Sequence, residues 1–220
     1  MKILQLFNQR RVLGGEDRMV EFLEKTLTES GHEVETWFKS NTRLETRTLS
    51  KVGAAIGGIY NFISRTEMAV VLGRLQPDIV HCHNLYPLFS PSVLDAARDA
   101  GIPTLVHLHG NLLTCPITTH FTEGKVCDRC LGGHELNCVT HNCRQSIAES
   151  IAYALRTAIA RKLKMFGRSV TLLTMSEFSK QRLLMTGYEE RDIAIIPNAV
   201  QIPADPALGG EYIGFAPHWE

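Results

Sequence analysis

The chain begins with a buried strand, a helix and a second buried strand, and this order constrains the fold more than any other feature. Lys2–Phe7 (KILQLF) is a short apolar run that predicts a strand. A helix with apolar residues on one face follows Gly14-Gly15-Glu16 and is expected to end at Gly31. Val34–Phe38 predicts the next strand. Since such a unit needs a right-handed crossover, the sequence predicts a parallel sheet.

The alternation of strands and helices continues to about residue 200. The later predicted strands are Asp78–His83, Thr104–Leu108, Val170–Met175 and Ile193–Ile196. The predicted helices between them cover residues 90–101, 146–166 and 176–187. Ser90-Pro91 and Ser176 are suitable helix starts, and Gly101 and Gly187 are suitable stops. A chain of 220 residues can bury a full core. We therefore predict one α/β domain with about six strands.

Two segments depart from this pattern. Residues 41–65 contain Arg43, Arg47 and Lys51, followed by an uncharged run. They indicate either a mobile loop with a partly buried helix or an element that binds an acceptor or a membrane surface. From Gln201 the sequence resembles a linker, and an apolar piece, Tyr212–Phe215, follows. We therefore divide the chain into a domain over residues 1–205 and a linker with the start of a second domain over residues 206–220.

Composition narrows the function less than the motifs do. Lys+Arg and Asp+Glu both number 23, so net charge does not indicate a nucleic-acid partner. The sequence has no apolar run long enough to cross a bilayer and no signal-peptide pattern, which predicts a cytoplasmic protein. Basic residues on the 146–166 helix indicate either a solvated face or peripheral contact with anionic lipid at the cytoplasmic membrane face.

Polar residues and glycines gather where the predicted strands end. His109 and Gly110 directly follow Thr104–Leu108, and ligands of parallel α/β sheets bind just beyond the carboxyl ends of strands. His81 and His83 alternate along the third strand and are expected to face the same side of the sheet. Gly14-Gly15 precedes a helix whose N-terminus would attract a phosphate, and a flexible turn is the alternative interpretation.

Five of the six cysteines lie close together in the sequence, and these are Cys115, Cys127, Cys130, Cys138 and Cys143. Cys127-Asp-Arg-Cys130 has the spacing that lets two thiolates take adjacent corners of a tetrahedron around Zn²⁺. Cys115 and Cys143 would complete a four-thiolate site, with Cys138 or His141 as the competing fourth ligand. Because four thiolates leave no position for water, the predicted zinc is structural.

The cysteine pattern also has other interpretations. Disulfides or unligated thiols are the alternatives to zinc, although cysteines in the cytoplasm more often bind metal than form disulfides. A redox Cys-x-x-Cys is disfavoured because the motif does not open a helix after a strand. Cys82, the sixth cysteine, lies inside a predicted strand and is expected to be a small core residue.

Together, these features resemble the N-terminal half of a retaining family 4 glycosyltransferase with the type B fold. The segments that carry the resemblance are MKILQLF, Gly14-Gly15-Glu16, Pro77–His81, Ile102–His109, Ser176–Lys180 and Ile196–Val200. Cys115-Pro116 and Gly124–Cys130 resemble a bacterial subgroup with a cysteine-bound insert. The resemblance implies two Rossmann-like domains facing a cleft. The N-terminal domain mainly holds the acceptor, and the C-terminal domain holds the nucleotide-sugar donor.

The resemblance also implies roles for particular residues. Gly15, with Gly14 beside it, would bring backbone N–H groups near the donor diphosphate. His109 matches a histidine that contacts the transferred sugar and helps stabilise charge at the reacting centre, which fits an oxocarbenium-like transition state. From the residues alone, a capping hydrogen bond in a loop is the alternative for His109. The remaining residues expected near the cleft or hinge are Glu16, His83, Asn111, Ser176 and Asn198.

The implied function is transfer of a sugar, with retention, from a nucleotide-sugar to a glycan or lipid-linked acceptor in surface polysaccharide or glycoconjugate biosynthesis. No catalytic metal is expected. Since the donor-binding residues of such enzymes belong to the C-terminal domain, a chain ending at Glu220 is expected to be an acceptor-side half that is inactive alone. The alternative is a free-standing module that binds a sugar or lipid phosphate or docks a partner. A nicotinamide-dependent oxidoreductase is disfavoured because no Gly-x-Gly-x-x-Gly follows the first strand.

Overall fold

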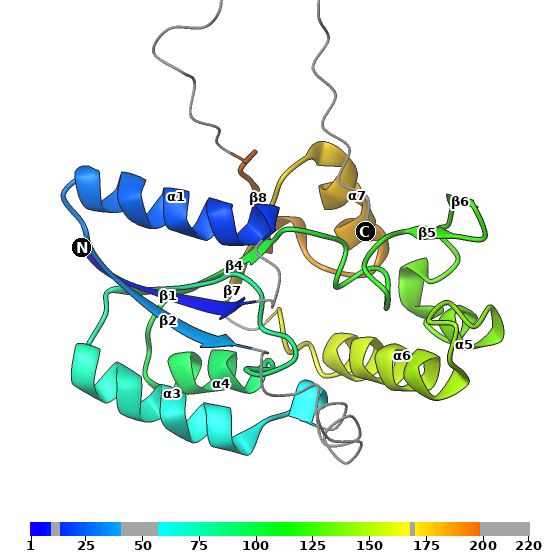
Figure 1. Ribbon diagram of the computed structural model, residues 1–220, viewed down its shortest axis with the longest axis horizontal. Coiled ribbons are helices and arrows are strands. Elements are labelled where there is room, and N and C mark those ends of the chain that lie inside the picture. The colour runs from blue at the N-terminus through cyan, green and yellow to red at the C-terminus, as the bar shows by residue number, and fades with distance from the viewer. Residues whose placement is uncertain (10–13, 41–56, 168–169, 199–220) are drawn as a thin grey trace, which may run out of the picture.

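A computed structural model describes residues 1–9, 14–40, 57–167 and 170–198 of the chain. Its main feature is a parallel sheet with helices on both faces (Figure 1). The strands are β1 (Lys2–Gln9), β2 (Glu33–Ser40), β3 (Ile79–Cys82), β4 (Thr104–Leu108), β7 (Val170–Thr174) and β8 (Ile193–Ile195). Their spatial order is β2-β1-β3-β4-β7-β8, and neighbouring strands pair in parallel. The predicted α/β class and the parallel sheet are confirmed.

Some of the predictions fall on parts of the chain outside these ranges. They concern the basic residues Arg43, Arg47 and Lys51 and the start of a second domain over residues 206–220. The linker from Gln201 onwards also lies outside the described residues. These assignments therefore stay predictions.

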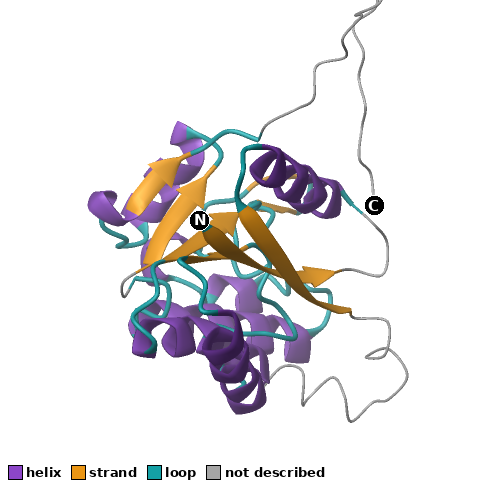
Figure 2. Cartoon of the chain, turned by 90° about the vertical axis from the view of Figure 1, so that its left-hand side faces the viewer, coloured by secondary structure: helices purple, strands orange, loops and turns teal. Residues whose placement is uncertain are grey.

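The helices form two layers around the sheet. Figures 1 and 2 show α1 (Gly15–Glu29) and α7 (Glu177–Met185) on one face of it. The opposite face is covered by α3 (Phe62–Leu75), α4 (Ser92–Asp99) and α6 (Ile147–Lys162). Strand side chains of the core include Leu4, Leu6, Val80, Cys82, Val106 and Leu172, all at most 1% exposed. Cys82 is therefore the small core residue that its strand position predicts.

The starts of α3 and α4 lie in contact, and the start of α4 differs from expectation. Within the segment where a partly buried helix was predicted, residues 57–59 are helical and α3 begins at Phe62, where the Asn61 side chain accepts a hydrogen bond from the Ser64 N–H (3.1 Å). Ser90 is not the N-cap of α4, because Pro91 takes that position. The Ser90 hydroxyl instead accepts a hydrogen bond from the Asn61 N–H (2.9 Å). The same hydroxyl also accepts a hydrogen bond from the Ser92 N–H (3.3 Å), so it combines a local contact at the start of α4 with a tertiary contact to the start of α3.

The region between β4 and α6 contains the cysteine insert, which we define as residues 115–143. Its elements are β5 (Phe121–Thr122), β6 (Lys125–Val126), the 3-10 helix η2 (Leu131–Gly133) and α5 (Asn137–Thr140). A further 3-10 helix, η3 (Glu190–Asp192), precedes β8. The strands β5 and β6 form an antiparallel pair, α5 packs against α6, and η2 contacts α7 (Figure 1). The insert is therefore packed against helices from both layers.

An ion pair ties the cysteine insert to α7. Both carboxylate oxygens of Asp128, which lies between the knuckle cysteines, accept hydrogen bonds from Arg182 at 2.8 Å. The Arg182 side chain is only 10% exposed. On the insert side, His120 Nδ1 lies 3.1 Å from the same carboxylate. Because a buried guanidinium needs a partner, this pair fixes the position of the knuckle on the sheet domain.

We expect Asp128→Asn to lower the free energy of unfolding by about 2 kcal/mol, because the buried Arg182 loses a charged, two-oxygen partner. Urea unfolding followed by circular dichroism measures this change. Glu123→Gln is the matched control within the same insert. Its ion pair with Arg129 spans 3.4 Å between exposed side chains and should contribute less than about 0.5 kcal/mol. Equal stabilities for the two variants would contradict the anchoring role of Asp128.

A second ion pair, between Arg161 of α6 and Glu135, ties the insert to α6. Gly133 lies close to the guanidinium of this pair. Arg161 binds Glu135 through two hydrogen bonds of 2.6 and 3.2 Å, and Glu135 is only 5% exposed. Gly133 has φ +98°, and a Cβ atom there would lie 2.6 Å from Arg161 Nη2. A side chain at position 133 would therefore collide with the guanidinium that neutralises a buried carboxylate.

Gly133→Ala should therefore destabilise the protein by about 3 kcal/mol, through loss of the Arg161–Glu135 pair together with backbone strain. Gly124→Ala provides the comparison, since Gly124 also has positive φ (+74°), but a Cβ atom added there would have no neighbour within 4 Å. That variant should lose only about 1 kcal/mol. Thermal unfolding of both variants separates the strain, which they share, from the collision, which only Gly133→Ala has.

Candidate functional site

The carboxyl ends of the parallel strands meet at one edge of the sheet, where the candidate site lies. β1, β3 and β4 are consecutive neighbours, so the residues that follow them emerge side by side. The helix α1 begins after β1, and its N-terminus lies at this same edge (Figure 1). His83 follows β3 and His109 follows β4. The topology thus brings these residues together as the sequence predicted for ligand-binding positions in a parallel sheet.

His83 and His109 are in direct contact at this edge. His83 Nδ1 lies 3.0 Å from His109 Nε2, which is a hydrogen bond whichever ring carries the proton. His83 is buried and His109 is half-buried. Burial, with smaller contributions from His107 and His81, lowers the pKa of His109 to about 3. At neutral pH His109 is therefore an uncharged imidazole, able to donate or accept a hydrogen bond but not to act as a cation.

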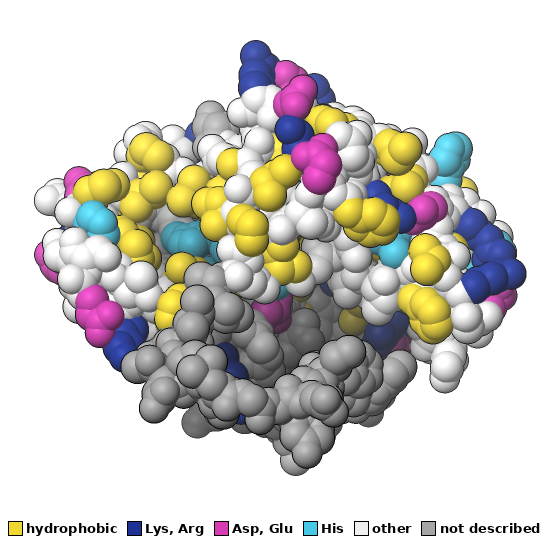
Figure 3. Space-filling model, turned by 90° about the horizontal axis from the view of Figure 1, so that it is seen from above, with side chains coloured by type: hydrophobic (Ala, Val, Ile, Leu, Met, Phe, Trp, Pro, Cys, Tyr) yellow, Lys and Arg dark blue, Asp and Glu magenta, His cyan; other side chains and the backbone are white. Residues whose placement is uncertain are grey.

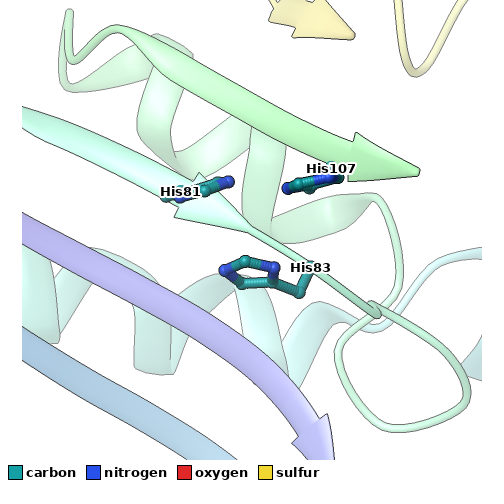
Figure 4. Close-up of side chains that lie close together, drawn as sticks. All are labelled: His81, His83 and His107. Carbon is teal, nitrogen blue, oxygen red and sulfur yellow. The ribbon is translucent and has the colours of Figure 1, made fainter. Parts of the chain in front are cut away.

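Two further histidines extend this contact into the sheet. His81 in β3 and His107 in β4 are buried, and their ring centroids lie 5.7 Å apart (Figure 4). The rings of His81 and His83 are 4.2 Å apart, as are those of His107 and His109. Burial, and then His107, lowers the pKa of His81 to about 4. Burial also lowers the pKa values of His83 and His107. We call these four residues the histidine cluster.

The sequence predicted only part of this cluster. His81 and His83 were expected to share a face of the sheet, and they do. His107 was missed as a site residue, although His107 and His109 repeat the same alternating pattern in the next strand. Since β3 and β4 pair directly, two such motifs place all four rings on one face. On the side that carries α1 and α7, histidine side chains are visible among hydrophobic ones (Figure 3).

The glycines before α1 differ in their surroundings. The Gly14 N–H donates a 2.7 Å hydrogen bond to Asp17 Oδ2, so a diphosphate would have to displace a carboxylate there. Gly15 is exposed and forms the first residue of the helix, and no atom lies within 4 Å of its Cβ position. The backbone at Gly15 is therefore accessible to a ligand, and Glu16, the next residue, is half-buried in the first turn.

The other residues expected near the cleft have structural contacts of their own. Ser176 is the N-cap of α7, as predicted, and its hydroxyl accepts a hydrogen bond from the Ser179 N–H (3.3 Å). The Asn111 carbonyl accepts hydrogen bonds from the N–H groups of Thr114 and Cys115, which turns the chain into the insert. Asn198 is exposed beyond β8. Among the described residues, none of these three hydrogen-bonds to His109.

The cysteines of the insert surround one small cavity. Its lining includes all five of them, Cys115, Cys127, Cys130, Cys138 and Cys143, and its volume is about 10 Å³. A volume of this size fits one water molecule or ion. Burial, and then the neighbouring thiols, raises the pKa of Cys130 to about 12, and burial and Cys143 raise that of Cys138 to about 12. Bare thiolates are therefore unstable here, and a cation would have to displace the thiol protons.

The structure distinguishes between the two competing fourth ligands. Cys138 is only 1% exposed and lines the cavity. His141 is not part of the lining, and its Nδ1 lies 3.0 Å from the Asn137 carbonyl oxygen. The geometry thus favours Cys138 over His141. The five sulfur atoms are nevertheless farther apart than the ligands of a bound metal. Among the described residues, only His81, His83 and His107 offer three ligand atoms all within 4.8 Å of one another, and no three of the cysteines do.

The comparisons with known proteins place this chain in a family. Residues 13–202 match Glycosyltransferase Family 4. No curated protein matches the sequence. One solved structure that is similar, described as the S. aureus MnaA-UDP co-structure, has a TM-score of 0.35 and 12% identity, covering 90% of this chain and 68% of that chain. This likeness is too weak to bear on substrates. Since the family match covers most of the sequence, the chain belongs to glycosyltransferase family 4.

Proposed function

We propose that this domain is the acceptor-side domain, residues 1–205, of a retaining glycosyltransferase. The reaction transfers a sugar from a nucleotide-sugar to a glycan or lipid-linked acceptor, in surface polysaccharide or glycoconjugate biosynthesis at the cytoplasmic face of the membrane. The observation that carries the proposal is His109, a neutral imidazole at the carboxyl end of β4, hydrogen-bonded to the buried His83. Membership of glycosyltransferase family 4 supports the same reaction class.

The geometry suggests how the chain's own residues would act. His83 holds the ring of His109, so its free nitrogen, Nδ1, keeps a fixed direction at the sheet edge. There it hydrogen-bonds to a hydroxyl of the transferred sugar and stabilises the charge redistribution as the glycosidic bond to the diphosphate breaks. The accessible backbone at Gly15, at the positive end of the α1 dipole, attracts the departing diphosphate.

The experiment that tests the proposal uses the protein as the cell makes it. We would incubate it with a panel of nucleotide-sugars and a lipid extract of the source cell, follow nucleotide release, and identify the product by mass spectrometry. NMR of the new glycosidic bond then reports its configuration. Release from one donor with an unchanged anomeric configuration supports the proposal. Saturable sugar or lipid-phosphate binding without consumption of any donor would instead favour a free-standing binding module.

For the cysteine insert, we propose one structural zinc ion. Its ligands would be Cys115, Cys127, Cys130 and Cys143, with Cys138 as the alternative to one of the outer two. The shared cavity supports this proposal, because five thiols converge on a volume of ionic size. Zinc would displace the thiol protons and hold the four resulting thiolates together through metal–sulfur bonds. The bound metal would staple the insert without an open position for catalysis.

We also propose a peripheral contact of α6 with anionic lipid. Ile147, Ile151 and Leu155 recur every four residues on this helix and are between 41% and 52% exposed. Lys162 and Lys164 are exposed near its C-terminal end. An apolar stripe next to lysines is the pattern of a helix that lies on a membrane surface. Among the described residues, no helix is both long and apolar enough to cross a bilayer.

Cosedimentation with vesicles tests this contact. The protein should bind vesicles that contain anionic phosphatidylglycerol and not those of phosphatidylcholine alone, because the lysines need the negative surface. We expect Ile151→Glu to weaken binding at least about fivefold, since it adds a charge to the inserting stripe. Met185→Glu serves as the control, because Met185 is also an exposed apolar residue but lies on α7, across the sheet. Equal binding of the two variants would exclude α6 as the contact.

A further inference from the structure

The histidine cluster has a property that sugar transfer does not explain. Three of its members, His81, His83 and His107, point toward one another, and their ligand atoms all lie within 4.8 Å (Figure 4). His81 and His107 lie in the directly paired strands β3 and β4, His83 directly follows β3, and each is at most 8% exposed. Because the backbone of a parallel sheet fixes the positions of their Cα atoms, the three rings are held together whether or not a substrate is present.

Buried polar atoms normally have hydrogen-bond partners, but several ring nitrogens of the histidine cluster have none among the described residues. His81 Nε2, His83 Nε2 and both ring nitrogens of His107 are buried without a partner among the described residues. Gln5 lies beside His81 in the strand register, is fully buried, and also leaves both side-chain amide atoms unpaired. A ligand that binds several of these nitrogen atoms at once, and that holds a water molecule next to Gln5, would give all of these buried atoms a partner.

We propose that His81, His83 and His107 bind one divalent transition-metal ion of the zinc class. Uncharged imidazole nitrogens are the preferred ligands of zinc, and three of them with one open position are the ligand set of a non-structural zinc site. Two nitrogens on the same zinc lie about 3.4 Å apart, so ligand atoms that are within 4.8 Å of one another need to close by at most about 1.4 Å. Water on the open position would offer a hydrogen-bond partner to the unpaired amide of Gln5, which pairs with His81 in the strand register.

The hydrogen bond from His83 to His109 supports this assignment. A neutral imidazole carries one proton, so a metal on His83 Nε2 leaves the proton on Nδ1, which then donates to His109 Nε2. Metal-bound histidines typically donate their second N–H in this way. The metal would therefore fix the tautomer of both rings and leave the proton of His109 on Nδ1, facing away from the cluster. This site does not rest on sugar transfer and can be tested without any donor or acceptor.

The first experiment uses the unmodified chain and Zn²⁺ alone. We would label the histidines with ¹⁵N and record their ring nitrogen signals during a zinc titration. The signals of His81, His83 and His107 should shift together and saturate at one equivalent beyond the zinc held by the cysteines. Unchanged signals from these three rings up to a tenfold excess of zinc would overturn the proposal. Because no substitution is made, a folding defect cannot imitate either result.

Substitutions then assign the ligands. His81→Gln and His107→Gln should each weaken this zinc equivalent at least 100-fold, as measured by competition with a chromophoric chelator. His134→Gln is the matched control, since His134 is an exposed histidine of the insert. Cobalt separates the two metal sites, because thiolate ligands give an intense sulfur-to-metal absorption that histidine ligands lack. Loss of that absorption in His107→Gln, or unchanged zinc affinity in both variants, would contradict a histidine site. A failed transferase assay would leave these results standing.

Discussion

His109→Ala is expected to lower kcat of the transferase about 100- to 1,000-fold, the loss seen when one preorganised hydrogen-bond partner of a transition state is removed. Its stability should fall by only about 1 kcal/mol, because His109 is half-buried and makes one neutral hydrogen bond, to His83. Initial rates of nucleotide release and urea unfolding measure the two effects. The contrast between a large loss of turnover and a small loss of stability is what identifies a residue at the reacting centre.

Two comparisons sharpen this test. His134→Ala removes an exposed histidine from the same chain and should leave kcat unchanged. His109→Asn keeps one hydrogen-bond donor at a similar distance and should recover part of the lost rate, because the ring is neutral and its charge is not needed. If His109→Ala turned over as fast as the unmodified enzyme, His109 would have no part in the mechanism. If His109→Asn lost as much activity as His109→Ala, the imidazole itself would be required.

Loss of the proposed zinc should have a large effect on stability, comparable to that of Gly133→Ala. Cys130→Ser removes a knuckle ligand and should lower the free energy of unfolding by about 3 kcal/mol, a fall of about 10 °C in Tm for a domain of this size. Metal analysis should show one zinc equivalent fewer per chain. Limited proteolysis should then cut within the cysteine insert, residues 115–143, because its short strands and helices bury little apolar surface of their own.

Cys82→Ala is the control for this experiment. Cys82 is the one cysteine that does not line the cavity, and it is buried in β3. The variant should keep its full zinc content and its resistance to proteolysis, and lose only the small packing contribution of one sulfur atom. A zinc-free preparation with the Tm of the unmodified protein would show that the cysteines are structural thiols, and so would a Cys130→Ser variant with unchanged zinc.

The fold could be predicted because its signals are local and repeated. Each buried strand is a short apolar run, and helix starts such as Ser176 and Ser146 satisfy their own backbone N–H groups. α3 was the exception. Its buried positions, Met68 and Leu72, alternate with exposed apolar residues such as Val70, so its sequence shows no clear apolar stripe. The start of α4 was predicted one residue too early, and the Ser90 hydroxyl bonds both to the Ser92 N–H and to the Asn61 N–H, the second a contact made only in the folded chain.

The candidate site was predictable only in part, because some of its residues come together only through contacts between separate segments of the folded chain. His109 and His83 could be found from their positions at strand ends. His107 lies inside a strand, and only the pairing of β3 with β4 reveals that it joins them. Likewise, spacing in the sequence could group the cysteines but could not decide between Cys138 and His141, since the choice depends on which side chain turns toward the cavity.

The ion pair between Asp128 and Arg182 has a consequence for how the protein opens. The carboxylate of Asp128 lies between the two knuckle cysteines. If the insert detached, the guanidinium of Arg182, which is only 10% exposed, would remain on the sheet domain without its partner. Local unfolding of the insert therefore carries the cost of disturbing α7 as well. The insert and α7 therefore form one cooperative unit. Fluctuations that begin in the cysteine insert extend to the helix that follows β7, and neither segment moves independently of the other.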